Sequence, residues 1–191
     1  MKIVIGISGA SGSSYAVALL KRLRGNEIHL IITEAAKLVI KQETSYTIGE
    51  IEDLADYVYH QDGIGAPIAS GSFRFDAMVI IPCSIKTLSA IASSYSDNLL
   101  IRAADVALKE KRRLILCTRE MPLHEGHLNM MMIAARLGSV ICPLSPAFYN
   151  NPMTINDILE QVSSKIIDLL GIEDISVRRW AGLKEHGFSS A

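Results

Sequence analysis

The 191-residue sequence lacks a long apolar run, an excess of either charge and a signal peptide, and each absence argues against a class of protein. No apolar run approaches the ~20 residues that a membrane-spanning helix needs. Neither sign of charge prevails, because 19 Lys and Arg residues stand against 20 Asp and Glu residues. This balance argues against electrostatic binding of nucleic acid. The first residues have neither the basic region nor the cleavage site of a signal peptide. We therefore expect a soluble cytoplasmic protein without a membrane or nucleic-acid partner.

Cysteine is also scarce. The three cysteines, Cys83, Cys117 and Cys142, each lie in or beside an apolar run, and no two have the spacing of metal ligands. This pattern is typical of buried free thiols in a reducing compartment. His124 and His127 lie three residues apart on an expected helix, but no third ligand accompanies them. We therefore predict no metal site.

Apolar runs alternate with helical patterns along the chain. Hydrophobic residues make up 49% of the sequence and charged residues 20%, which suits one folded core. We predict a single domain over residues 1–191, with a polar C-terminal tail from about residue 172. The expected strands are Lys2–Ser8, Glu27–Thr33, Ala77–Pro82, Arg113–Thr118 and Ser139–Leu144. Most of these runs are apolar throughout, which is typical of strands covered on both faces.

The expected helices lie between these strands. They are Ser11–Arg24, Glu34–Gln42, Ser84–Ser93, Asp97–Lys111, Leu123–Leu137 and Thr154–Leu170. A short helix at Ile51–Tyr57 and a short strand at Val58–His60 are also expected. This alternation predicts an α/β fold with a doubly wound parallel sheet. In such sheets, ligands bind beyond the carboxyl ends of the strands.

The turn after the first strand, Gly6–Gly12 (GISGASG), is rich in small residues. It matches neither the P-loop pattern nor the dinucleotide fingerprint, because Ile7 stands two residues before Gly9. Ser8 and Ser11 offer hydroxyl groups, and the following helix offers backbone N–H groups that attract anions. The turn therefore predicts either an anion site or an ordinary serine-capped turn.

The stretch Val79–Ala92 repeats this arrangement. An apolar run stops at Pro82, and Ser84 can cap the helix that follows. Lys86 in the first turn opposes the helix dipole unless an anion balances its charge, although it can also be a solvated surface lysine. Two adjacent strand ends with serine-rich helix starts favour one ligand that spans both. That geometry suits a flavin mononucleotide better than a dinucleotide.

A third strand ends in the pair Arg119 and Glu120. The arginine can bind a phosphate or carbonyl in bidentate fashion, and the glutamate can exchange a proton if its pKa is shifted. A surface ion pair is the plain alternative. Further on, Tyr149 and Lys165 can complete an anion site only if another chain or the tail folds toward them.

Taken together, these segments resemble the UbiX-type flavin prenyltransferases (UbiX/Pad1-like, within the flavoprotein superfamily). The motifs that carry the resemblance are Gly6–Gly12, Ala69–Phe73, Pro82–Ala92, Thr118–Met131 and Pro146–Ile158, with Arg179, Trp180 and Gly182 near the end. The resemblance covers nearly the whole chain. It implies a Rossmann-like, flavodoxin-type three-layer sandwich, assembled as a homododecamer with active sites at subunit interfaces.

The resemblance also implies a reaction. Dimethylallyl monophosphate alkylates reduced FMN at N5 and C6 without a metal, and the prenylated FMN serves a UbiD-type decarboxylase. FMN would be held by Gly9, Ala10, Ser11, Thr33, Ser84, Ile85, Lys86, Thr87 and Arg119. The catalytic residues would be Glu120, Ser11 and Glu43.

The prenyl phosphate would be bound by Tyr149, Lys165, Lys109, Arg102, Phe73 and Trp180, some of them reaching across an interface. The family often has arginine at the position of Lys165. Lysine keeps the positive charge there but lacks the bidentate fork.

Two other functions are compatible with the same fold. An FMN-dependent decarboxylase of peptidyl-cysteine type would use a histidine after the second strand, yet no histidine lies between His29 and His60. A non-catalytic flavin-binding or carrier protein would have no use for Glu120, Tyr149 and Lys165 together.

Overall fold

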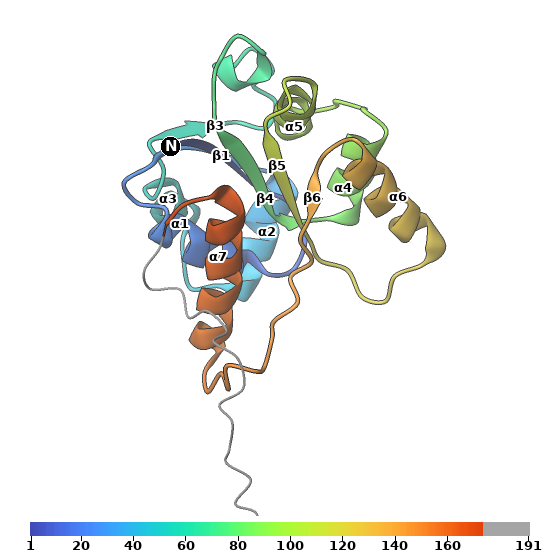
Figure 1. Cartoon of the computed structure of the whole chain (residues 1–191). Coiled ribbons are helices and arrows are strands. Elements are labelled where there is room, and N and C mark those ends of the chain that lie inside the picture. Colours follow the sequence, from blue (N-terminus) through green and yellow to red (C-terminus); the bar gives the residue numbers. More distant parts are fainter. Residues whose placement is uncertain (174–191) are drawn as a thin grey trace, which may run out of the picture.

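The computed structural model describes residues 1–173, in which a six-stranded parallel sheet lies between two layers of helices (Figure 1). The strands are β1 (Lys2–Ile7), β2 (Glu27–Ile32), β3 (Tyr57–Tyr59), β4 (Ala77–Cys83), β5 (Arg113–Thr118) and β6 (Val140–Ile141). Their order in the sheet is β3-β2-β1-β4-β5-β6. Without the short edge strand β3, this is the flavodoxin order, so the predicted fold class is confirmed.

Helices cover both faces of the sheet. They are α1 (Ser13–Arg22), α2 (Glu34–Glu43), α3 (Ile48–Glu52), α4 (Ile85–Ala92), α5 (Leu99–Lys109), α6 (Glu125–Arg136) and α7 (Ile155–Leu170), with a 3-10 turn at Pro67–Ala69. The core on one face is packed by α1, α2 and α7, and the core on the other by α4, α5 and α6. No helix within residues 1–173 is long and apolar enough to cross a membrane.

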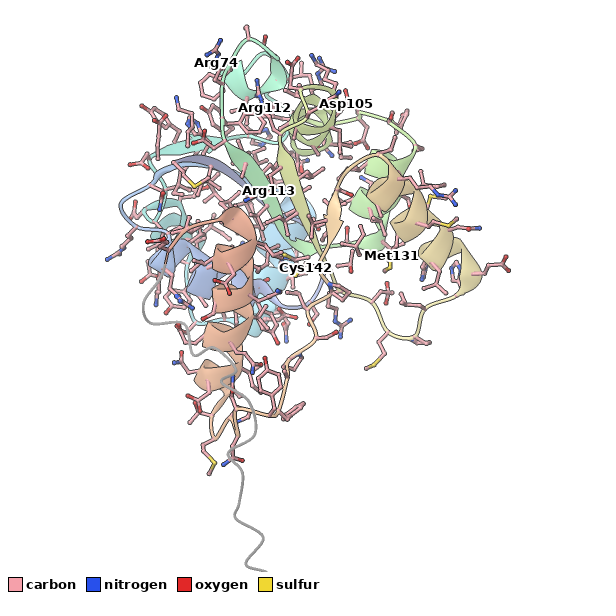
Figure 2. The ribbon with its side chains drawn as sticks, in the orientation of Figure 1. Arg74, Asp105, Arg112, Arg113, Met131 and Cys142 are labelled. Carbon is pink, nitrogen blue, oxygen red and sulfur yellow. The ribbon has the colours of Figure 1, made fainter. Side chains whose placement is uncertain are left out.

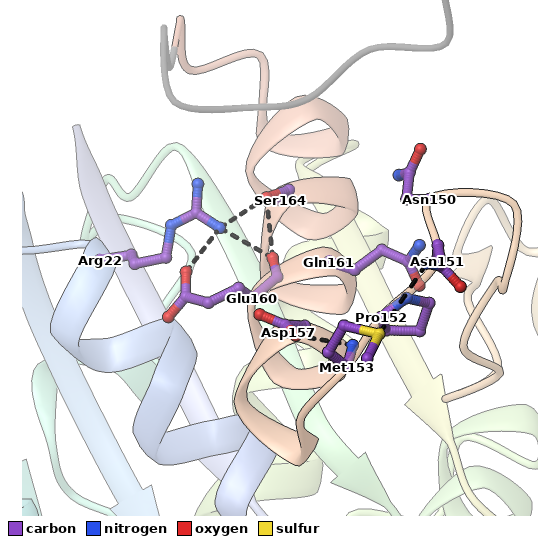
Figure 3. A pocket seen from close by; sticks show the side chains of 9 residues that line it. All are labelled: Arg22, Asn150, Asn151, Pro152, Met153, Asp157, Glu160, Gln161 and Ser164. Atoms are coloured by element: carbon purple, nitrogen blue, oxygen red, sulfur yellow. Dashed lines mark hydrogen bonds and ion pairs between the residues drawn. The ribbon is translucent and has the colours of Figure 1, made fainter.

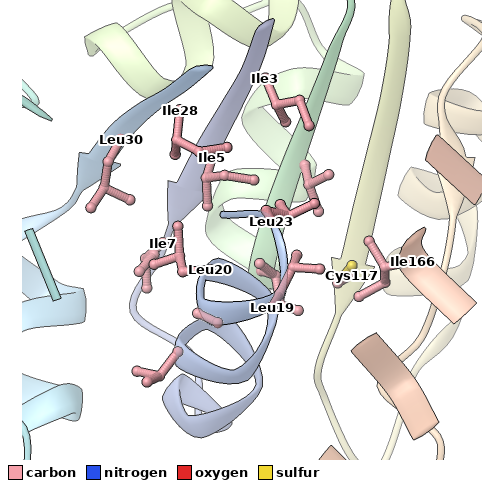
Figure 4. Close-up of a cluster of buried hydrophobic side chains, with 14 of the residues drawn as sticks. Ile3, Ile5, Ile7, Leu19, Leu20, Leu23, Ile28, Leu30, Cys117 and Ile166 are labelled. Atoms are coloured by element: carbon pink, nitrogen blue, oxygen red, sulfur yellow. The ribbon is translucent and has the colours of Figure 1, made fainter. Parts of the chain in front are cut away.

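Alternating side chains of β1 supply both cores, because successive residues of a strand point to opposite faces. Ile3, Ile5 and Ile7 pack against α1, as Figure 4 shows, while Val4 belongs to the core on the opposite face. Each of these side chains is fully buried. Burying one such side chain stabilises the fold by roughly 1.5–3 kcal/mol, so this strand anchors both layers.

The structure corrects the expected boundaries in two regions. The short helix predicted at residues 51–57 begins earlier, at Ile48, because Thr47 and Glu50 form a capping box at its start. The following strand is Tyr57–Tyr59 instead of residues 58–60. The last strand, predicted over residues 139–144, is Val140–Ile141, although the N–H groups of Cys142 and Leu144 still donate to the carbonyls of β5.

The chain reverses its direction of winding between β1 and β4. From β1 it proceeds to β2 on one side, and from β4 to β5 on the other. The serine after β1 joins the two corners, since the Ser8 hydroxyl donates to the carbonyl of Pro82 at 2.8 Å and accepts from the backbone N–H of Ser84 at 2.8 Å. The two serine-rich turns are therefore neighbours, as predicted, at the point where doubly wound sheets bind their ligands.

Candidate active site

The first turn needs glycine at two positions. A Cβ atom on Gly9 would lie 2.5 Å from the Cβ of Ala35, so only glycine lets the turn approach the start of α2 this closely. Gly12 has a φ of 110°, which glycine adopts readily, and it is the N-cap of α1. Because glycine has no side chain, Gly12 cannot itself accept a hydrogen bond from the first N–H groups of the helix. The N-terminus of α1 therefore depends on another residue for its cap.

Glu43, the last residue of α2, supplies that cap. Its carboxylate accepts hydrogen bonds from the backbone N–H groups of Gly12 at 2.8 Å and Ser13 at 3.0 Å. Partial burial of the carboxylate opposes its ionisation, but these bonds and one from the Ser11 hydroxyl outweigh that cost and lower the pKa. The anion at this helix start is thus a side chain of the chain itself, where the sequence predicted a ligand or a serine cap.

The second turn has the cap that the sequence predicted. The Ser84 hydroxyl oxygen accepts from the N–H of Thr87 at 3.3 Å and begins α4. The ammonium group of Lys86 is exposed and lies 3.5 Å from the carboxylate of Asp97. A side chain of this chain therefore offsets the unfavourable position of Lys86 at the start of the helix.

The third strand end faces the first turn. The positive charge of Arg119 lowers the pKa of Glu43, so the guanidinium group lies within electrostatic reach of that carboxylate. The backbone N–H of Arg119 donates to the carbonyl of Cys83 at 3.2 Å, which ties the end of β5 to β4. Glu120 is exposed, and its carboxylate accepts from the N–H of Met121 at 3.2 Å.

Two buried hydroxyl groups flank these strand ends without a hydrogen-bond partner among the described residues. They belong to Ser13, in the first turn of α1, and Thr118, the last residue of β5. Buried polar groups are rarely left unpaired, so these hydroxyls indicate that a polar molecule completes the site. With the glycine turn, Ser84, Thr87 and Arg119, they fit a flavin nucleotide.

All of the residues predicted to hold FMN or to act as catalytic residues are brought together at the carboxyl edge of the sheet. These residues are Gly9, Ala10, Ser11, Thr33, Glu43, Ser84, Ile85, Lys86, Thr87, Arg119 and Glu120. Thr33 follows β2, where its side chain caps α2 by accepting from the N–H of Ala36 at 3.2 Å. The role of each residue toward a ligand stays a prediction.

Phe73 and Lys109 lie at the opposite edge of the sheet. The Phe73 ring is 4.7 Å from the ammonium nitrogen of Lys2, where β1 begins. Lys109 ends α5 and pairs with Glu110, close to Gly71. A single chain therefore does not place Phe73 or Lys109 beside the first turn.

Arg102 is also engaged away from the first turn. Its guanidinium group donates to the carbonyl of Ala69 at 3.1 Å and to the carboxylate of Asp105 at 2.9 Å. Figure 2 shows Asp105 on the same side of the molecule as Arg112, away from Cys142. Arg102 is thus held by Ala69 and Asp105 of its own chain, and its role toward the donor stays a prediction.

The remaining candidates follow the last strand. Lys165 is exposed on α7, and its charge lowers the pKa of Cys142, which places its ammonium group near the end of β6. Tyr149 is 62% exposed on the segment between β6 and α7. Trp180 lies outside the described residues.

A cavity of about 390 Å³ lies apart from the predicted residues, between α1, α7 and the segment before α7 (Figure 3). Its lining residues are Arg22, Asn150, Asn151, Pro152, Met153, Asp157, Glu160, Gln161 and Ser164. Arg22 crosses from α1 to α7, where it donates to the hydroxyl of Ser164 at 2.6 Å and pairs with Glu160 at 3.3 Å. Five of the lining residues, from Asn150 to Asp157, belong to the motif Pro146–Ile158, but none of the nine was predicted as a site residue.

The two histidines have a structural role. His124 is the N-cap of α6 and accepts from the N–H of Gly126 at 3.0 Å, while its ring packs 3.6 Å from that of His127, centroid to centroid. Within residues 1–173, no three His, Cys, Asp or Glu side chains gather as ligands for a metal ion.

Comparison with known proteins places the chain beside flavin enzymes. A family model described as Flavoprotein matches residues 1–176. The flavin prenyltransferase UbiX of Thauera aromatica is 49% identical over 187 residues, which cover 97% of this chain and 96% of the relative. A solved structure of AnUbiX (PadA1) in complex with FMN and dimethylallyl pyrophosphate matches with a TM-score of 0.94 at 42% identity, covering 96% of this chain and 98% of the other.

A second solved structure matches almost as well. It is a dodecameric FMN-dependent UbiX-like decarboxylase from Escherichia coli O157:H7, with a TM-score of 0.92 at 44% identity and coverage of 95% and 100%. The FMN-dependent cysteine decarboxylase SpaF matches at a TM-score of 0.63 but only 16% identity, covering 85% of this chain and 97% of the other, which shows a shared fold and no more.

Proposed function

Because the chain belongs to the flavoprotein family, among the UbiX-type flavin prenyltransferases, we propose that it transfers a dimethylallyl group to N5 and C6 of reduced FMN. The donor is dimethylallyl monophosphate, and the product is prenylated FMN for a UbiD-type decarboxylase. One observation carries the proposal: at the carboxyl ends of β1 and β5, the carboxylate of Glu43 accepts a hydrogen bond from the Ser11 hydroxyl and lies within electrostatic reach of Arg119. Hydroxyl, carboxylate and guanidinium groups that meet at a ligand-binding edge of the sheet support a catalytic role for these residues.

The phosphate group of FMN is assigned to the second turn. Glu43 already binds the N–H groups of Gly12 and Ser13, so these donors at the start of α1 are engaged. The start of α4 offers backbone N–H groups and the hydroxyl of Thr87, and Arg119 adds a positive charge nearby. When bound, reduced FMN supplies the nucleophilic ring atoms.

Two carboxylates take different roles. Glu43 has a lowered pKa and stays ionised at neutral pH, so it can stabilise positive charge that develops on the dimethylallyl group. The Ser11 hydroxyl donates to it and keeps it oriented. Glu120 is exposed beside Arg119, where it can exchange a proton as the phosphate departs.

The phosphate of the donor needs cations, because a monophosphate leaves poorly unless its developing charge is neutralised. Lys165 and Tyr149 follow the last strand of one chain. Arg102, Lys109 and Phe73 lie away from the first turn of that chain. We therefore assign Arg102, Lys109 and Phe73 to a neighbouring copy that completes the site.

Exposed apolar side chains support such an assembly. On α6 and the residues next to it they are Met121, Leu123, Leu128, Met132 and Leu137, and on the segment before α7 and its first residue they are Phe148, Met153 and Ile155. Large apolar side chains gathered on an exposed element are typical of an interaction surface. With the dodecameric relative, it favours a homododecamer. A cytoplasmic location belongs to the same proposal, because all three cysteines are free, as in a reducing compartment.

The decisive experiment is anaerobic incubation of the protein with reduced FMN and dimethylallyl monophosphate, followed by mass spectrometry of the flavin. We expect an added five-carbon unit. A parallel incubation with the diphosphate identifies the preferred donor. A flavin of unchanged mass with both donors would overturn the proposal, and release of CO₂ from a peptide with a C-terminal cysteine would favour the peptidyl-cysteine decarboxylase instead.

A further inference from the structure

Two of the three cysteines lie opposite each other on neighbouring strands. β5 and β6 are parallel, with Leu116 paired to Ile141, so the next residues in register are Cys117 and Cys142. The backbone N–H of Cys142 donates to the carbonyl of Leu116 at 2.9 Å, which continues the pairing beyond β6. Adjacent strands are about 4.8 Å apart, which is within the Cα separation that a disulfide bridges.

Both thiols point to the same face of the sheet. Cys117 is buried in the core beneath α1 and α7, and Cys142 packs against that core while staying partly exposed. Figure 4 shows Cys117 on β5 beside Ile166 of α7, and Figure 2 shows Cys142 at the end of β6. Cys83 belongs to the core on the other face, so it cannot take part in this pair.

The two thiols differ in reactivity. A hydrogen bond from Cys117 lowers the pKa of Cys142 to about 7, burial opposes this shift, and the nearby Lys165 ammonium group reinforces it. Burial raises the pKa of Cys117 well above its ordinary value. Cys142 is therefore the thiol that is both accessible and partly ionised near neutral pH, and Cys117 is its protonated neighbour.

We propose that Cys117 and Cys142 form an oxidation site, in which a peroxide converts the facing thiols into an intramolecular disulfide. The Cys142 thiolate attacks one peroxide oxygen, which gives a sulfenic acid and releases the other oxygen as water or alcohol. The Cys117 sulfur then attacks the Cys142 sulfur, and the sulfenic oxygen leaves as water. Two thiols are oxidised, one peroxide is reduced, and a reductant reverses the bond.

The position of the pair connects this chemistry to the candidate active site. Arg119 follows Cys117 by two residues, and the segment leading to Tyr149 follows Cys142. A disulfide would therefore join β5 to the start of that segment, directly before the residues assigned to FMN and the donor. Its formation involves neither flavin nor donor, so it can be tested independently of the proposed function.

The test is peroxide treatment of the full-length protein, followed by thiol counting under denaturing conditions and peptide mapping. We expect the protein to lose two of its three free thiols and to regain both with dithiothreitol. Cys83→Ser is the matched control and should still form the disulfide. Cys142→Ser should keep Cys117 as a free thiol.

A second variant fixes the order of the steps. In Cys117→Val, which nearly conserves volume in the core, Cys142 should accumulate as a sulfenic acid that dimedone labels. Four results would overturn the proposal. They are three free thiols after treatment of the wild-type protein, a disulfide that involves Cys83, oxidation of Cys117 in Cys142→Ser, and labelling of Cys117 ahead of Cys142.

Discussion

The carboxylate of Glu43 lies 2.8 Å from the backbone nitrogen of Gly12, so the last residue of α2 caps the first turn of α1. The same carboxylate accepts a hydrogen bond from the Ser11 hydroxyl and faces the charge of Arg119. A negative charge at a helix N-terminus is favourable, because the helix dipole and the unpaired N–H groups attract it. This contact makes Glu43 important for both stability and the site.

Replacing Glu43 with glutamine should lower the free energy of unfolding at neutral pH by about 0.3–1 kcal/mol, the usual value of a charge at a helix N-terminus. The pKa of Glu43 in the folded protein lies below its ordinary value of 4.5. Its stabilising charge is therefore fully present above pH 4.5 and is lost as the pH falls through the lower, folded-state pKa. Thermal unfolding of wild type and Glu43→Gln should differ at neutral pH and converge in acid.

Glu50 provides a matched control for this variant. It caps α3 through Thr47, whose backbone N–H and hydroxyl lower the pKa of Glu50, but it belongs to no part of the candidate site. Glu50→Gln should show a stability difference with the same dependence on pH and full prenylation activity. If Glu43→Gln and Glu50→Gln lose the same fraction of prenylation activity, the loss follows from reduced stability and not from a role of Glu43 in the site.

Gly9→Ala should disrupt the first turn. The added Cβ would lie 2.5 Å from the Cβ of Ala35, so the turn or α2 must move, which costs about 1–3 kcal/mol in a well-packed region. We expect weaker FMN binding, measured by flavin fluorescence, and a lower Tm. Gly49→Ala on α3 is the control, since nothing lies within 4 Å of its Cβ, and it should leave FMN affinity unchanged.

Glu120→Gln should separate binding from chemistry. The carboxylate is exposed and accepts a hydrogen bond from the neighbouring backbone N–H of Met121, so its loss should not disturb the fold. We expect FMN affinity to stay as in wild type while kcat for prenylation falls by about 10²–10⁴, as when an acid–base group is removed. Glu125→Gln, two residues before His127 on α6, is the control and should keep kcat. An unchanged kcat in Glu120→Gln would remove the proposed role of this residue.

The sequence was sufficient to predict the sheet and most of its ligand-binding edge. Apolar runs mark the buried strands, and the serines after β1 and β4 mark helix starts, so the neighbouring turns followed from local pattern. Glu43 was named only through the resemblance, because its contact with Gly12 spans thirty-one residues and no local pattern encodes it. The capping box of α3 was readable as Thr47 and Glu50, yet the predicted helix was placed three residues too late.

Register between distant strands was not predictable from the sequence. The pairing of Cys117 with Cys142 depends on how β6 aligns with β5, and two separated cysteines do not reveal it. The sequence also does not reveal which residues of one copy contribute to the active site of a neighbouring copy. Lys109 and Phe73 are predicted to bind the donor, but their places at the amino edge of the sheet follow from tertiary packing alone.

A site shared between copies predicts that two impaired variants restore each other. Lys109→Ala should raise the KM for the donor and leave FMN affinity unchanged, because Lys109 ends α5 at the edge of the sheet opposite the FMN turns. When Lys109→Ala and Glu120→Gln chains are unfolded and refolded together, some sites combine Glu120 of one chain with Lys109 of the other, and prenylation should reappear. Refolding each variant alone is the control. Mixed assemblies as inactive as the separate variants would place Lys109 outside the active site of a neighbouring copy.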